Sequence, residues 1–239
     1  MNNLCVDHVL CVHNLSRSFG GVRALCNIEI HITRGNITGL IGPNGSGKTT
    51  LFQAISGMDR GFTGDIRLEH KSIAKKRASR IYRSGLARTF QLSRPFPELT
   101  VIENLIAAGK PHEPNLHDRA DQLLAQVHLD RYHNVFAKDL SYGQQRLVEF
   151  LRVLMNDPTL ILLDEPAAGI NPTLRRILWD MVHGLNAKGT TFFIIEHDMS
   201  VIADLCTDVY VLNEGENIAY GDLASIRKDK RVLEAYFGT

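Results

Sequence analysis

The N-terminal third of the chain alternates apolar and polar residues with the period of a β-strand. Segments 4–19 and 27–32 follow this alternation, 36–42 is a short apolar run that ends in glycine, and 65–70 repeats the strand pattern. Successive side chains of a strand point to opposite faces, so these segments predict strands of which at least one face is buried.

Helical spacing begins after the glycines at 42–47. In segment 48–58, Leu51, Ile55 and Met58 fall on one predicted face. Further helices are predicted at 100–109, 118–129 and 143–156.

Segments 160–164 and 191–196 are apolar runs that end in an acidic residue. Such runs are typical of parallel strands buried on both faces. Segment 209–222 predicts a hairpin that turns through 213–215. The alternation of strands and helices, with a helical stretch inserted, predicts an α/β fold with a small all-α lobe.

The composition narrows the class of protein. Hydrophobic residues make up 44% of the 239 residues and charged residues 22%, which is ordinary for a soluble globular domain, and the net charge of +1 gives no global attraction to nucleic acid or an anionic bilayer. No apolar run reaches the roughly 18 residues of a membrane span, and no basic-then-apolar leader is visible, so we expect a cytosolic protein. Cys5, Cys11, Cys26 and Cys206 form no Cys-x-x-Cys pair and have no histidine cluster nearby in the sequence. We therefore expect the cysteines to be small buried hydrophobic residues in a reducing compartment, rather than metal ligands or partners in disulfides.

A phosphate-binding loop is predicted at 42–49, where GPNGSGKT matches G-x-x-x-x-G-K-[ST] between a predicted strand and a predicted helix. Its glycines let backbone N–H groups turn toward phosphate oxygens at a helix N-terminus. We expect Lys48 to reach the β- and γ-phosphates and the Thr49 hydroxyl to bind Mg²⁺. The alternative, a glycine-rich turn that happens to contain lysine, does not explain a complete motif in this context. The predicted nucleotide contacts are Gly42, Pro43, Asn44, Gly45, Ser46, Gly47, Lys48, Thr49 and Thr50.

Two acidic residues follow the apolar run at 160–163. A carboxylate at the C-terminal tip of a buried strand lies where α/β sheets bind ligands. Asp164 is predicted to hold Mg²⁺, and Glu165 to orient or deprotonate the water that attacks the γ-phosphate. His197 lies just past the next predicted strand, and we expect it on the γ-phosphate side of the site.

The segment LSYGQQR, 140–146, raises a separate question, because a phosphate loop alone already holds a nucleotide. The Ser141 hydroxyl and the Gly143 N–H at the start of a helix are good phosphate donors, and Gln144 adds a side-chain amide. The same residues also form the S-x-x-Q pattern of a helix capping box. The two interpretations are compatible, because a capped N-terminus is still directed at an anion.

The order of the motifs resembles that of the ATP-binding cassette ATPases. The chain has the phosphate loop, a glutamine after an apolar segment (ARTFQ, ending at Gln91), LSYGQQR, LILLDEP and IIEHD in that family's sequence, and the resemblance covers essentially the whole chain. It implies an α/β P-loop NTPase (RecA-like) core with an antiparallel β-subdomain and an inserted α-helical subdomain. It also implies one domain over 1–239, with the core at about 1–91 and 159–239 and the helical subdomain at about 92–158.

The resemblance also implies roles for individual residues. In that family two cassettes pair head to tail, so Ser141, Gly143 and Gln144 of one subunit would contact the γ-phosphate of ATP held by the other. Gln91 would bind Mg²⁺, contribute to catalysis and sense a transmembrane partner. Phe19 would stack on adenine, with core packing as its alternative.

Longer segments resemble the ATP-binding subunits of bacterial branched-chain amino-acid importers, among them GLARTFQLSRPFPELTVIENL, DEPAAGINP and IEHDM. Tyr142 and Asn171 stand where the wider family usually has Gly and Asp.

The resemblance implies an ATP-hydrolysing subunit that uses ATP and Mg²⁺ to energise an importer. Its partners would be transmembrane permease subunits and a second ATP-binding subunit, either itself or a sister cassette. It would lie on the inner face of the cell membrane and contact the membrane through the permease only. A cassette that powers the movement of a different solute is one alternative. A non-transport mechanochemical ATPase is another, although the sequence contains no coiled-coil insertion, zinc pair or second cassette.

Two further segments carry predictions about the surface. The basic segment 75–83 predicts a solvated helix face, with contact to a membrane partner as the alternative, and no nucleic-acid binding is expected. The apolar, turn-rich segment 95–99 follows Gln91. The resemblance places this segment beside a groove that receives a short helix of the transmembrane subunit, and core packing is the alternative for Phe96 and Leu99.

Overall fold

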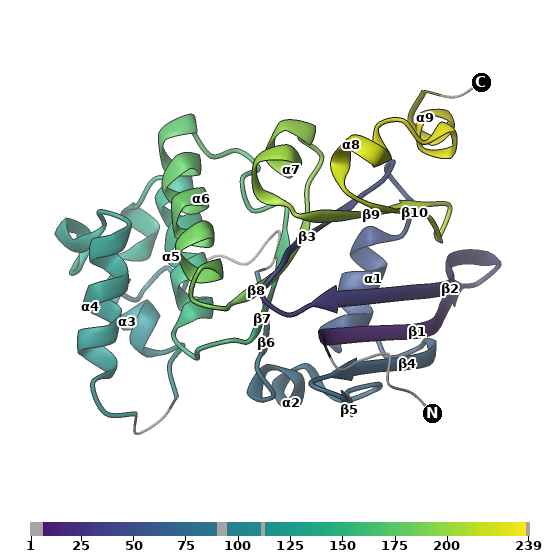
Figure 1. The fold of residues 1–239 in the computed structure, drawn as a ribbon. Helices are drawn as coiled ribbons and strands as arrows, with labels where there is room; N and C mark the ends of the chain where they lie inside the picture. Colours follow the sequence, from purple (N-terminus) through teal and green to yellow (C-terminus); the bar gives the residue numbers. More distant parts are fainter. Residues whose placement is uncertain (1–6, 90–94, 111–112, 238–239) are drawn as a thin grey trace.

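A six-stranded sheet runs through the centre of the structure (Figure 1). The computed structural model describes residues 7–89, 95–110 and 113–237. The strand order is β10-β9-β3-β8-β7-β6, in which only β10 runs antiparallel to its neighbour. The strands are β3 (Ile37–Ile41), β6 (Leu86–Arg88), β7 (Leu160–Asp164), β8 (Thr191–Ile195), β9 (Asp208–Asn213) and β10 (Glu216–Gly221). The predicted parallel strands and the hairpin of β9 and β10 are confirmed.

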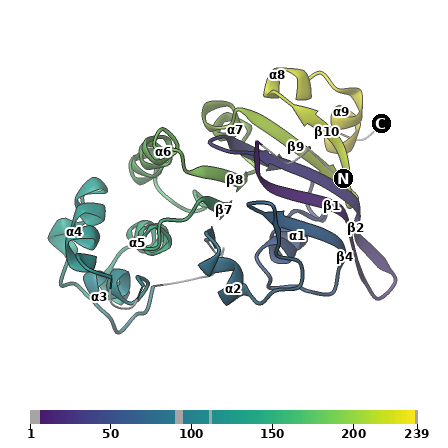
Figure 2. The same cartoon turned by 60° about the horizontal axis from the view of Figure 1, so that its bottom comes forward.

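A second sheet is antiparallel and has the order β2-β1-β4-β5. Its strands are β1 (His8–Phe19), β2 (Val22–Thr33), β4 (Thr63–Leu68) and β5 (Lys71–Ser72). It lies on the opposite side of the large sheet from α3, α4 and α5 (Figure 2).

Helices cover the large sheet and extend beyond it. They are α1 (Lys48–Ile55), α2 (Ala78–Arg83), α3 (Val101–Ile106), α4 (Leu116–Gln126), α5 (Tyr142–Leu154), α6 (Pro172–Asn186), α7 (Met199–Leu205), α8 (Leu223–Ile226) and α9 (Lys230–Phe237), with 3₁₀ turns η2 (Asp130–Tyr132) and η3 (Ala137–Asp139). Helices α3, α4 and α5 group together at one end of the molecule (Figure 1). This arrangement confirms the predicted P-loop core with an antiparallel β-subdomain and an inserted helical subdomain.

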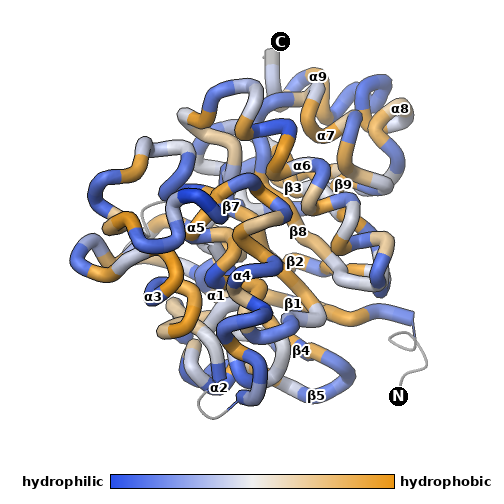
Figure 3. The backbone as a smooth tube through the Cα atoms, turned by 90° about the vertical axis from the view of Figure 1, so that its left-hand side faces the viewer, coloured by the Kyte–Doolittle hydropathy of each residue, from blue (hydrophilic) through white to orange (hydrophobic). Residues whose placement is uncertain are grey.

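The central strands are buried because alternate side chains enter cores on opposite faces. In β7, Ile161 and Leu163 pack with the helical side, whereas Leu160 and Leu162 pack with α1 and the small sheet. Figure 3 shows hydrophobic residues along these central strands. A strand buried on both faces has no reason to alternate, which explains the continuous apolar runs.

Three expectations need correction. Helix α1 ends at Ile55, and Met58 lies beyond it with 57% of its side chain exposed, so Met58 does not share the buried face. Cys11 is disulfide-bonded, contrary to the expectation of reduced cysteines, while Cys26 and Cys206 are free thiols. Strand pairing also brings histidines to Cys11, with the Cys11 sulfur and ring nitrogens of His13 and His31 within 4.8 Å of one another. Among the described residues, no helix is both long and apolar enough to cross a membrane.

Candidate nucleotide site

The phosphate loop connects the end of β3 to the start of α1, as predicted. Gly42 and Gly47 have φ angles of 151° and 104°. A Cβ atom at Gly47 would lie 2.5 Å from the Ala24 carbonyl oxygen, and one at Gly42 would lie 2.1 Å from the Leu212 carbonyl oxygen. Both positions therefore require glycine for conformation and for space.

Lys48 is folded back onto this loop. Its Nζ donates hydrogen bonds to the carbonyl oxygens of Gly42 at 2.8 Å and Pro43 at 2.9 Å, and it lies 3.4 Å from the Ser46 hydroxyl. Burial lowers the pKa of Lys48, while the charges of Glu165 and Asp164 act in the opposite direction. The ammonium group is thus held at the cradle by neutral oxygens, which an anionic phosphate can replace as its partner.

A hollow of about 250 Å³ opens over the loop. It is lined by Ala24, Asn44, Gly45, Ser46, Gly47, Lys48, Thr49, Thr50, Glu165 and His197. The structure therefore brings the loop residues together with Glu165 and His197, two of the predicted catalytic residues, which are 32 positions apart in the sequence.

Glu165 and His197 form a hydrogen-bonded pair at the rim of the hollow. Glu165 Oε1 lies 2.7 Å from His197 Nε2. Glu165 follows β7 with a φ of 47°, and its N–H donates to the Ile195 carbonyl of β8 at 3.0 Å. A left-handed conformation is unfavourable for glutamate, so the neighbouring strand holds the residue in a backbone geometry that it would not adopt alone.

Asp164 is buried at the tip of β7 and paired with Arg88 at the end of β6. Arg88 Nη2 donates to Asp164 Oδ2 at 2.8 Å, and the side chains are 6% and 2% exposed respectively. Asp164 and the Thr49 hydroxyl supply oxygen ligands, which is the ligand type that Mg²⁺ prefers. The donor set therefore fits a magnesium ion.

The segment LSYGQQR begins α5 and lies outside the hollow over the phosphate loop. Ser141 caps the helix: Gln144 N–H donates to Ser141 Oγ at 3.4 Å, and Ser141 N–H donates to Gln144 Oε1 at 2.9 Å. The predicted capping box is confirmed. Gly143 is buried where a Cβ would lie 2.6 Å from Leu174 Cδ1 of α6, so glycine permits close packing of the two helices.

Phe19, the predicted adenine contact, is not among the residues that line the hollow. Phe19 is 47% exposed at the end of β1, with the Arg17 guanidinium carbon 4.0 Å from its ring centroid, so core packing of Phe19 is wrong and its role with adenine stays a prediction. Gln91 lies outside the described residues. Phe96 is 48% exposed with the Arg152 guanidinium carbon 4.5 Å from its ring centroid, so it does not fill the core.

Sequence reasoning missed two charged residues beside the site. Arg88 lies within a short strand, and Glu196 directly follows β8, whereas Asp164 is the last residue of β7. Glu196 is 7% exposed, accepts a hydrogen bond from the His197 N–H at 3.3 Å, and has a pKa raised mainly by burial. An acidic residue at the end of an apolar run was the available signal.

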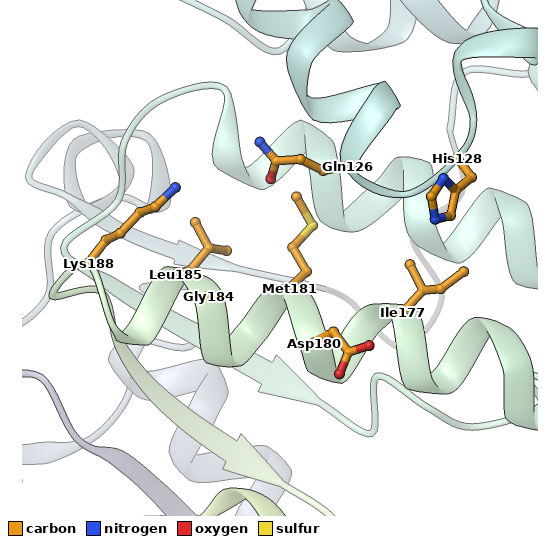
Figure 4. Close-up of a pocket in the computed structure, with 8 residues that line it drawn as sticks. All are labelled: Gln126, His128, Ile177, Asp180, Met181, Gly184, Leu185 and Lys188. Carbon is orange, nitrogen blue, oxygen red and sulfur yellow. The ribbon is translucent and has the colours of Figure 1, made fainter.

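A second hollow, also of about 250 Å³, lies between the end of α4 and the outer face of α6 (Figure 4). Its floor contains Ile177, Met181 and Leu185, and its rim contains His128 and Lys188. It contains none of the predicted nucleotide contacts and is a separate feature of the surface.

Comparison with known proteins agrees with this geometry. The family profile described as "ABC transporter" matches residues 25–168, more than half of the chain. The chain belongs to this ATP-binding cassette family, and it is an ATP-binding and ATP-hydrolysing transporter subunit.

Individual relatives match over nearly their full length. The chain is 35% identical to a probable branched-chain amino acid transport ATP-binding protein LivG of Methanocaldococcus jannaschii, covering 96% of this chain and 97% of the relative. It is 36% identical to the high-affinity branched-chain amino acid transport ATP-binding protein LivG of Escherichia coli K12, covering 96% and 98%. A solved ATP-binding cassette of an ABC transporter in its ADP conformation has a TM-score of 0.87 and 35% identity, covering 97% of this chain and 99% of that one.

Proposed function

We propose that this subunit powers the import of branched-chain or chemically related amino acids. The substrate class is supported by the names of the relatives that it matches over nearly their whole length. The observation that carries the ATPase mechanism is the hydrogen-bonded pair of Glu165 and His197 in the same hollow as the phosphate loop.

In the proposed reaction the phosphate loop holds ATP. Lys48 exchanges its carbonyl partners for phosphate oxygens, and Thr49 with Asp164 holds Mg²⁺, while Gln91 is assigned as a further ligand on the resemblance alone. The metal, when bound, neutralises negative charge on the phosphates. Glu165 accepts a hydrogen bond from the attacking water, and His197, 2.7 Å from Glu165, orients that carboxylate and faces the γ-phosphate.

A second cassette completes the proposed site. Ser141, Gly143 and Gln144 do not line the hollow of their own chain within the described residues. Ser141 is exposed at the N-terminus of the 13-residue helix α5, where backbone N–H groups and the helix dipole favour an anion. The head-to-tail pairing of the family would bring this helix end to the ATP of the partner. Phe19 remains the proposed adenine contact.

The proposed permease contact lies near Phe96 and places the subunit at the inner face of the membrane. A large aromatic side chain that is 48% exposed beside a cationic side chain is typical of an interface anchor. Contact with the bilayer would be made only through the permease. The core and helical subdomains proposed above would then move relative to each other as ATP is bound and released.

Reconstitution tests this proposal. The subunit would be placed with its permease subunits in proteoliposomes, and ATP-driven uptake of labelled leucine and labelled urea would be compared, with Lys48→Ala as the inactive control. We expect leucine uptake that requires ATP and Lys48. Uptake of urea without leucine would overturn the substrate class, whereas leucine uptake by the Lys48 variant would overturn the site.

A further inference from the structure

The side chain of Arg88 joins two parts of the nucleotide site that are far apart in the sequence. It lies at the end of β6, where Arg88 is the register partner of Leu162 in β7, two residues before Asp164. Its guanidinium therefore reaches along the neighbouring strand to the carboxylate at the strand tip.

The two ends of the guanidinium fork have different partners. Nη2 donates to Asp164 Oδ2 at 2.8 Å, and Nη1 donates to the Ser56 hydroxyl at 3.1 Å. Ser56 donates in turn to the Phe52 carbonyl of α1 at 2.7 Å. The Arg88 guanidinium carbon also lies 5.7 Å from the centroid of the Phe52 ring. Arg88 is thus fixed between the C-terminal end of the phosphate-loop helix and Asp164.

Burial decides what this contact does. A pair exposed by 6% and 2% is poorly screened by water, and a buried carboxylate without its counter-charge is strongly unfavourable. Because Arg88 binds Oδ2, the Asp164 carboxylate is held in one orientation.

We propose that Arg88 is a positioning residue for the magnesium site. By holding Oδ2 of Asp164 and the end of α1 in one fixed arrangement, it sets the direction in which the Asp164 carboxylate would meet a metal bound with ATP. Outer partners of metal-binding carboxylates act in this way, and their removal typically lowers metal affinity by about 10–100-fold. This inference rests on the proposed role of Asp164 in binding Mg²⁺.

The side chain of lysine cannot replace this arrangement. Lysine carries one ammonium head on a flexible stem, whereas the planar fork of arginine binds two partners at fixed directions. Arg88→Lys would keep the charge near Asp164 but lose the simultaneous contact with Ser56. Arg88→Gln would keep a donor and remove the charge.

The test separates metal-dependent from metal-independent binding. The affinity of the full chain for a non-hydrolysable ATP analogue would be measured by calorimetry with Mg²⁺ and with EDTA, for wild type, Arg88→Gln, Arg88→Lys, Ser56→Ala and Asp164→Asn. Circular dichroism would confirm folding. We expect Arg88→Gln to leave affinity in EDTA unchanged and to reduce the gain given by Mg²⁺ by about tenfold or more. Arg88→Lys should be intermediate, and Ser56→Ala, which leaves the Asp164 contact in place, should lie nearest wild type.

Two results would overturn the inference and can be told apart. If Asp164→Asn loses the Mg²⁺-dependent gain while both Arg88 variants keep it, Arg88 only stabilises the fold. If Asp164→Asn keeps the gain, the proposed metal role of Asp164 fails first, and the role of Arg88 fails with it. If Arg88→Gln does not fold, Arg88→Lys still decides between these results, because it keeps the charge near Asp164 and changes the geometry of the contact.

Discussion

Replacing Glu165 with glutamine separates ATP binding from ATP hydrolysis. Glu165→Gln keeps the size of the side chain and an oxygen near His197 Nε2, which lies 2.7 Å from Glu165 Oε1. It removes the negative charge that would accept a proton from water. The phosphate loop and Lys48 are unchanged, so ATP affinity should be equal to that of wild type or higher, because one negative charge near the phosphates is lost.

The expected loss follows from the role of a general base. Positioned proton transfer contributes about 10²–10⁴-fold to a rate, so kcat should fall by that factor. This equals a rise of about 3–5 kcal/mol in the activation barrier. Steady-state phosphate release gives kcat, and light scattering with ATP–Mg²⁺ gives the mass. The variant should accumulate as an ATP-dependent dimer, and adding Ser141→Arg should abolish that dimer.

The matched control is Glu234→Gln, the same change at an exposed glutamate of α9 outside the hollow. It should hydrolyse ATP at the wild-type rate. If Glu165→Gln hydrolysed ATP within about twofold of wild type, general-base catalysis by Glu165 would contribute almost nothing, and its catalytic assignment would be wrong. A persistent monomer would refute self-pairing while leaving the catalytic assignment in place.

Three further perturbations follow from the packing and charge of the site. Gly143→Val should destabilise the fold by about 1–3 kcal/mol in urea titrations, because the valine side chain would meet Leu174. Adding Leu174→Ala should recover part of this loss. An unchanged urea midpoint for the single variant would contradict the close packing of the two helices. Lys48→Ala should weaken ATP binding by about 10–100-fold in calorimetry, because it removes a charged hydrogen-bonding partner of the phosphates. An unchanged affinity for ATP would exclude Lys48 from phosphate binding. In the folded protein the pKa of Glu196 lies above its ordinary value of 4.5, so the folded state binds this proton more tightly than the unfolded state does. The stability that follows from this difference is present below pH 4.5 and is lost as the pH rises through the folded pKa. Glu196→Gln should therefore stabilise the protein more at pH 8 than at pH 5 in urea titrations, and an equal effect at both values would rule out this titration.

The sequence predicted the architecture because its strongest signals arise from local rules. The apolar runs that form β7 and β8 identify doubly buried strands, and the strand–glycine–helix context identifies the phosphate loop without reference to distant contacts. The pair of Glu165 and His197 was predicted as two separate residues, but their contact depends on neighbouring parallel strands. The bond between Arg88 and Asp164 also depends on strand order, which no short pattern specifies.

Surface positions were harder to predict because one residue type suits several environments. Core packing is an alternative that the sequence leaves open for Phe19 and Phe96, and their exposure of 47% and 48% excludes it. Met58 fits the helical period of α1, but the helix ends before it is reached. The contact of Cys11 with the histidines arises from pairing between β1 and β2, where Cys11 is the register partner of His31.

The separation of the LSYGQQR segment from the hollow of its own chain has a genetic consequence. Under the proposed pairing, each hydrolysis centre combines the loop of one copy with the Ser141 helix end of the other. A copy damaged at Lys48 and a copy damaged at Ser141 would then form one centre that carries both lesions and one that carries neither. Two alleles that are each inactive alone should therefore restore activity when expressed together, with one intact centre in each mixed pair and none in a pair of like copies.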